Sequence, residues 1–169
     1  MIQELIDLRQ SIIEGRTDDA LEIIDDLEGM SKEHILQKIE SFLVRLLVHL
    51  MKNNVDRHLT NSWAASMRDS LLKIQRLNLK ANKTSYYINQ ADWDVYLEDA
   101  FEDAIFEASI EVSEGAYKPG QLKEVVDKTE VLNVANKWLF LTYVCSREAL
   151  RDAINEEFGQ LPGGEDWYV

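Results

Sequence analysis

Apolar residues recur along this chain at intervals of three and four positions, the spacing that places them on one face of an α-helix. The clearest run predicts a helix from Ser31, as its N-cap, to Lys52. Its predicted core-facing residues are Ile35, Ile39, Phe42, Leu43, Leu46, Leu47, Leu50 and Met51. No run alternates apolar and polar residues between turn signals, as a half-buried strand does. The pattern therefore predicts an all-α protein.

Helical spacing and capping residues predict several further helices. Gly15 and Gly29 are expected to end two short helices, over residues 2–13 and from Thr17 or Asp18 to Leu27. The apolar face of the first is expected to point inward, with Ile2, Leu5, Ile6, Ile12 and Ile13. Later helices are expected over residues 62–79 (capped by Asn61 or Ser62), 91–113, 121–129 and 131–158, the last broken near Ser146. We expect a single bundle of about six to eight helices.

Composition excludes several classes of function. The chain has 169 residues, with 31 acidic and 18 basic side chains, so its formal charge is −13. This charge argues against non-specific nucleic-acid binding and against docking on anionic lipid. No apolar run approaches the ~18–20 residues that cross a bilayer. The N-terminal residues have no apolar signal core, and the single cysteine, Cys145, cannot form an internal disulfide. We expect a cytoplasmic protein without a membrane segment.

Several motifs resemble a known family. Glu40–Ser41 precedes Leu46, Leu47, His49 and Leu50, Ser62–Trp63 opens the next helix, and a Tyr, Ala and Glu pattern runs from Tyr96 to Glu111. With these motifs, roughly residues 14 to 129 resemble the domain of unknown function 29 family, which is common in cyanobacteria. The resemblance implies a helical, cytoplasmic, mostly cyanobacterial protein and transfers no activity. It divides the chain into a core, 1–129, and a C-terminal helical addition with a flexible tail, 130–169, packed on the same domain.

The histidines do not suggest a metal site. His34 and His49 lie 15 residues apart, about 22 Å along a helix, too far to share one ion. His49 follows Arg45 by one turn, but an acidic surface would repel RNA, which disfavours a helical ribonuclease. We predict no catalytic residue, no metal ligand and no cofactor.

The helix expected over 91–113 carries the strongest charge signal. Nine acidic residues lie between Asp92 and Glu114, and no Lys or Arg occurs between Lys83 and Lys118. Residues 32–83 have 10 basic and 4 acidic residues, and lie between acidic segments. We hypothesise that five basic residues of this middle segment partly neutralise the acidic helices. They are Arg45, Lys52, Arg68, Lys73 and Arg76.

Two apolar features remain unexplained by this pattern. Phe106 and Ile110 lie off the main apolar stripe of the acidic helix, and we favour their coverage by the C-terminal addition over a homo-oligomer interface. Trp167, Tyr168 and Val169 follow a Pro-Gly-Gly break. A partner that adds a strand could capture them with the terminal carboxylate, although a frayed or back-packed tail is favoured.

These observations favour an acidic helical interaction module that binds a protein partner with a basic surface. The candidate partner-binding residues are Glu98, Asp99, Glu102, Asp103, Phe106, Ile110, Trp167, Tyr168 and Val169. The alternative is a divalent-metal-dependent hydrolase that uses carboxylates of the acidic helices. Glu22/Asp25 and Glu111/Glu114 have the spacings of such enzymes.

Overall fold

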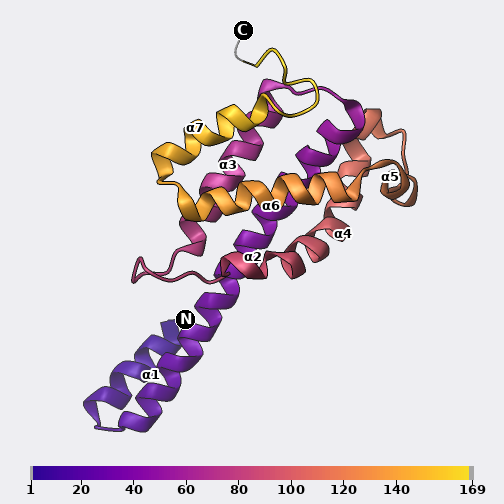
Figure 1. Cartoon of the computed structure of the whole chain (residues 1–169). Helices are drawn as coiled ribbons and strands as arrows, with labels where there is room; N and C mark the ends of the chain where they lie inside the picture. Colours follow the sequence, from indigo (N-terminus) through magenta and orange to yellow (C-terminus); the bar gives the residue numbers. More distant parts are fainter. Residues whose placement is uncertain (1, 168–169) are drawn as a thin grey trace. The chain divides into compact units, whose positions relative to one another are not determined.

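A computed structural model describes residues 2–167 of the chain (Figure 1). The described residues form seven α-helices and no strand, so the all-α prediction is confirmed. The helices are α1 (Ile2–Ile13), α2 (Thr17–Asp56), α3 (Asn61–Asn78), α4 (Trp93–Glu111), α5 (Pro119–Val125), α6 (Lys128–Val144) and α7 (Arg147–Phe158). Two 3₁₀ turns, η1 (Gln90–Asp92) and η2 (Val112–Gly115), flank α4. No helix within residues 2–167 is both long and apolar enough to span a bilayer.

The described chain consists of two compact units that divide after Lys38, within α2. The first comprises α1 and the beginning of α2. The second comprises the rest of α2 and all later helices.

The two helices expected on either side of Gly29 are one helix, so the predicted break is wrong. α2 runs for 40 residues without interruption. A glycine inside a helix is less favourable than alanine by only about 1 kcal/mol, and it does not by itself end the helix. Helical spacing continues on both sides of Gly29, so continuation is favoured. α2 ends at Asp56, and the next residue, Arg57, has a left-handed backbone with φ of 57°.

Replacing Gly29 with alanine is expected to raise the free energy of unfolding by about 0.5–1 kcal/mol, because the substitution restricts the unfolded chain. A Cβ at Gly29 meets no atom within 4 Å. Gly15→Ala is the matched control, since its Cβ also meets open space but its φ is +71°. We expect Gly15→Ala to destabilise. Chemical denaturation monitored by circular dichroism measures both, and equal losses of stability would contradict a helical Gly29.

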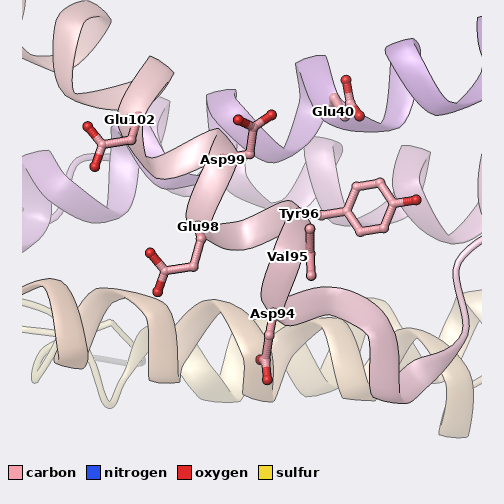
Figure 2. Close-up of a pocket in the computed structure, with 7 residues that line it drawn as sticks. All are labelled: Glu40, Asp94, Val95, Tyr96, Glu98, Asp99 and Glu102. Atoms are coloured by element: carbon pink, nitrogen blue, oxygen red, sulfur yellow. The ribbon is translucent and has the colours of Figure 1, made fainter.

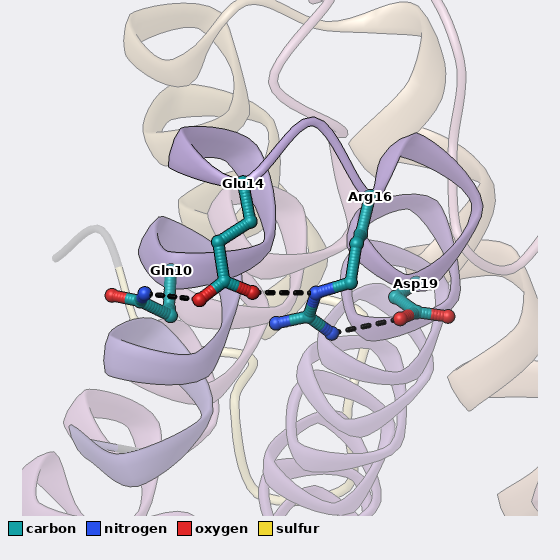
Figure 3. Close-up of polar contacts among 4 residues, drawn as sticks. All are labelled: Gln10, Glu14, Arg16 and Asp19. Carbon is teal, nitrogen blue, oxygen red and sulfur yellow. Dashed lines mark hydrogen bonds and ion pairs between the residues drawn. The ribbon is translucent and has the colours of Figure 1, made fainter.

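A network of polar side chains holds the turn between α1 and α2 (Figure 3). The Arg16 guanidinium donates to Glu14 and to Asp19, each at 2.8 Å, while the Gln10 amide donates to Glu14. The hydrogen bond from Gln10, followed by that from Arg16, lowers the pKa of the Glu14 carboxyl. These contacts favour a tight helical hairpin at Gly15.

The predicted inward face of α1 is wrong. Ser11 is the buried residue of this helix. The five apolar residues expected inside are between 51% and 79% exposed: Ile2, Leu5, Ile6, Ile12 and Ile13. Amphipathic spacing identifies an apolar face but not the element that covers it. The face of α1 that carries Ser11 is the covered one.

The second unit has its core around the C-terminal half of α2. Six of the eight predicted core-facing residues are buried there: Ile39, Leu43, Leu46, Leu47, Leu50 and Met51. Ile35, which belongs to the first unit, and Phe42 are half-buried. α6 and α7 pack on α3, and α4 packs on α5 and α6 (Figure 1). The largest buried side chains are Trp93, Trp138, Phe101 and Phe158.

Several helix ends follow from local sequence. Ser146 caps α7 by accepting a hydrogen bond from the backbone N–H of Ala149, so the predicted break there is confirmed. The N-cap of α3 is Thr60 and not Asn61 or Ser62, because its hydroxyl accepts from the backbone N–H of Trp63. α5 begins at Pro119, two residues before its expected start. Proline suits the first turn of a helix, where its missing N–H has no partner to lose.

Candidate functional site

The candidate site is the outward face of α4. The opposite face of this helix is buried in the core, through Trp93, Leu97, Ala100, Phe101, Ala104, Ile105 and Ala108. On the outward face, Val95, Phe106 and Ile110 are 76%, 68% and 75% exposed. The expected coverage of Phe106 and Ile110 by the C-terminal addition is therefore wrong. α6 and α7 use their buried residues elsewhere, in packing on α3 and beside the inner face of α4.

Five outward residues of α4 form one line, which we call the α4 strip: Val95, Asp99, Asp103, Phe106 and Ile110. Each follows the previous one by three or four positions, so all five lie on the same side of the helix. The strip is about 22 Å long at the helical rise of 1.5 Å per residue. Apolar and acidic side chains therefore share one exposed surface.

The carboxylates of α4 fall into two groups. Glu98 pairs with Lys128 at 2.7 Å, Glu102 accepts two hydrogen bonds from Lys123 at 2.7 and 2.9 Å, and Glu111 pairs with Lys52. The hydrogen bond from Lys123 lowers the pKa of Glu102, and that from Lys52 lowers the pKa of Glu111. These three acids are neutralised within the molecule.

The second group has no internal cation. Within residues 2–167, Asp94, Asp99, Asp103 and Glu107 form no ion pair. Glu98 and Glu102, which were predicted as partner-binding residues, are thus already occupied by lysines. Asp99 and Asp103 remain available for a cation from outside.

The hypothesis that the basic middle segment neutralises the acidic helices holds for Lys52 alone. Arg45 and Lys73 pair instead with Asp69 of α3, at 3.0 and 3.8 Å. Arg68 and Arg76 form no ion pair with any described residue. Lys123 and Lys128, which neutralise α4, come from α5 and α6. Sequence reasoning missed them because ion pairs depend on which helices become neighbours.

An open hollow of about 800 Å³ lies against the N-terminal half of the strip (Figure 2). It is lined by Glu40, Asp94, Val95, Tyr96, Glu98, Asp99 and Glu102. Three of its acids, Glu40, Asp94 and Asp99, form no ion pair among the described residues, so the hollow favours a cationic group. Glu40 enters from α2, and no sequence signal connects it to α4. Val95 lies off the main apolar stripe in the spacing as well, four residues before Asp99 and eleven before Phe106.

Trp167 does not join the strip. The ring of Trp167 packs edge-on against Phe158 of α7, with centroids 5.3 Å apart. Trp167 is half-buried there, as expected for a back-packed tail. Tyr168 and Val169 lie outside the described residues.

One of the carboxylates considered for metal chemistry is already paired with a lysine. Glu111 is held by Lys52, and Glu114 has a left-handed backbone in η2. Among the described residues, no three or more His, Cys, Asp or Glu side chains are grouped so that they could hold a metal ion.

Burial, followed by the charges of Lys52 and Arg45, lowers the pKa of His49 to about 4, although the Glu111 carboxylate opposes this shift. His49 is therefore neutral near pH 7.

A family model described as "Domain of unknown function DUF29" matches residues 7–129. The chain belongs to the DUF29 family. In this DUF29 protein the matched segment includes the whole α4 strip and Glu40, whereas nearly all of α6 and the whole of α7 follow it. Comparison with curated proteins and with solved structures gave no match.

Proposed function

We propose that this DUF29 protein is an interaction module that binds a basic amphipathic helix of a partner protein along the α4 strip. The observation that carries the proposal is the alignment of three exposed apolar side chains with two unpaired carboxylates. Val95, Phe106 and Ile110 supply apolar contact, and Asp99 and Asp103 supply charge.

The apolar residues support a helical partner. Single exposed apolar residues are ordinary on protein surfaces, but three on one line of one helix form a surface that a partner can cover. A helix that lies along this line would present its own apolar residues at intervals of three and four. Phe106, the aromatic residue of the strip, is the expected anchor.

The charge supports a basic partner. Residues 84–117 contain no Lys or Arg, so nothing on this segment offsets the free carboxylates of the strip. Lysine or arginine side chains of a partner would pair with Asp99 and Asp103 and would be steered toward the hollow beside Glu40. Nucleic acid and anionic lipid would be repelled by the same carboxylates.

A photo-crosslinking amino acid placed at position 106 in the native cell tests the proposal. We expect cross-links to a second protein, in a peptide that has Lys or Arg residues and helical apolar spacing. The same amino acid at Phe140, which is 44% exposed on α6, is the matched control. Cross-links only to a second copy of this chain, or equal yields at both positions, would show that the strip binds no such partner.

The cross-linked peptide then allows an affinity measurement. Phe106→Asp is expected to weaken its binding to the full chain by roughly 30-fold or more, as for a buried aromatic anchor worth ~2 kcal/mol. Phe140→Asp should leave the affinity unchanged. Isothermal titration calorimetry measures both, and an equal loss in both variants would contradict a site on α4.

A further inference from the structure

A separate pocket of about 520 Å³ lies where the end of α3 and the turn after it meet the corner between α6 and α7. Its lining includes Arg76, Lys80, Lys83 and Arg147, beside Leu79 and the rings of Tyr86 and Tyr143. Four of these residues are basic and none is acidic, although the chain has a net charge of −13. The pocket is thus a positively charged site on a negatively charged molecule.

The four cations come from three separate elements. Arg76 lies in the last turn of α3, Lys80 and Lys83 lie in the turn that follows, and Arg147 is the first residue of α7. None of them forms an ion pair in the part of the chain that the structure describes. The ammonium of Lys80 lies over the ring of Tyr87, 5.5 Å from its centroid. Because no carboxylate of the lining offsets these charges, an anion from outside would relieve their repulsion.

Hydrogen bonds hold the frame of the pocket in place. The Gln75 amide donates to the backbone carbonyls of Thr142 and Cys145, at 3.2 and 2.9 Å, and so joins α3 to the corner between α6 and α7. In the turn, the backbone N–H of Lys80 donates to the carbonyl of Ser85 at 2.9 Å. A frame fixed before binding loses little conformational entropy when a ligand enters.

The ring of Tyr143 is also fixed. Its hydroxyl accepts hydrogen bonds from Asn78 at 3.0 Å and Trp93 at 2.7 Å, and donates to the carbonyl of Ile88 at 2.6 Å. The ring of Tyr86 meets it edge-on, with centroids 4.6 Å apart. With Leu79, the two rings form an apolar wall beside the cations.

We propose that this pocket binds a small organic phosphate. The phosphate lies among Arg76, Lys80, Lys83 and Arg147, and the body of the ligand contacts Leu79 and the tyrosine wall. The volume is that of a small-molecule site, and apolar walls with a few convergent charges are the composition such sites have. The positive N-terminal end of α7, capped by Ser146, adds to the attraction for an anion. This proposal does not depend on the α4 strip.

Titration of the full chain with ATP and with tripolyphosphate, followed by calorimetry, tests the proposal. We expect ATP to bind with one site per chain, and to bind more tightly than tripolyphosphate because only ATP has a body for the apolar wall. Lys83→Glu combined with Arg147→Glu should weaken ATP binding by roughly 100-fold, about tenfold for each charge-assisted contact removed. Both positions are exposed, so the variant should fold, which circular dichroism checks.

The matched control is Lys32→Glu combined with Lys38→Glu, which changes the net charge equally on an exposed stretch of α2. We expect this control to bind ATP like the unmodified protein. An equal loss of ATP affinity in both double variants would mean that binding depends only on the net charge of the protein, and would overturn the site. Absence of ATP binding at millimolar concentration, equal affinity for tripolyphosphate, or tighter binding of a polyglutamate peptide would also overturn an organic-phosphate site.

Discussion

Trp138→Ala is expected to lower the free energy of unfolding of the unit formed by residues 39–167 by about 4 kcal/mol. The Trp138 side chain is fully buried, and its ring meets Phe158 edge-on with centroids 5.8 Å apart. Its indole N–H donates to Glu157 at 3.2 Å. Alanine would leave a cavity between α6 and α7 and remove both contacts. For a unit of this size the loss corresponds to a decrease in Tm of roughly 10–15 °C.

Phe140→Ala is the control for Trp138, because it removes a large aromatic side chain from the same helix at a site that is 44% exposed. We expect it to destabilise by about 1 kcal/mol or less. Urea denaturation followed by circular dichroism compares the two variants. Similar midpoints would mean that α6 is not part of the core of this unit, contrary to its burial.

Asn78→Leu is expected to lower the free energy of unfolding by about 3 kcal/mol, because it leaves the buried backbone N–H of Ile88 without a partner and removes two further hydrogen bonds. Asn78 is only 2% exposed. Its amide donates to the carbonyl of Ile88 at 2.9 Å and to the Tyr143 hydroxyl, and its oxygen accepts from the backbone N–H of Ile88 at 2.7 Å. Leucine has the same branched side-chain skeleton but can make none of these bonds, so the substitution removes hydrogen bonds without opening a cavity.

Asn133→Leu on α6 is the matched control, because this asparagine is exposed. Its expected effect is within about 0.5 kcal/mol. Thermal unfolding monitored by circular dichroism measures both variants. If Asn78→Leu were as stable as Asn133→Leu, the hydrogen bonds of Asn78 would contribute nothing net to folding.

The identity and ends of most helices could be predicted because they depend on neighbouring residues. Ser146 begins α7 wherever the chain lies in space, since its side chain caps an N–H three residues away. The break expected at Gly29 failed for a local reason as well. A glycine weakens a helix slightly, and that weakening is too small to decide between one helix and two.

The candidate site was predicted in part. Phe106 and Ile110 lie off the main apolar stripe of α4, a feature visible in the spacing, but the spacing did not show that they stay exposed. The spacing could not show that Glu102 is paired with a lysine while Asp103 is not. Only the placement of α5 brings Lys123 to Glu102, and nothing adjacent in sequence indicates that contact.

From the sequence alone, this protein is helical, strongly acidic and built from amphipathic segments. Helical periodicity and capping act over a few residues, so they can be read without knowing the fold. Tertiary structure alone decided which apolar faces stay exposed, as in α1 and the α4 strip, and which charges remain unpaired. Burial and ion pairing depend on elements far apart in the chain. For that reason the cluster of cations around Arg76 and Arg147 is evident only once the end of α3 meets the start of α7.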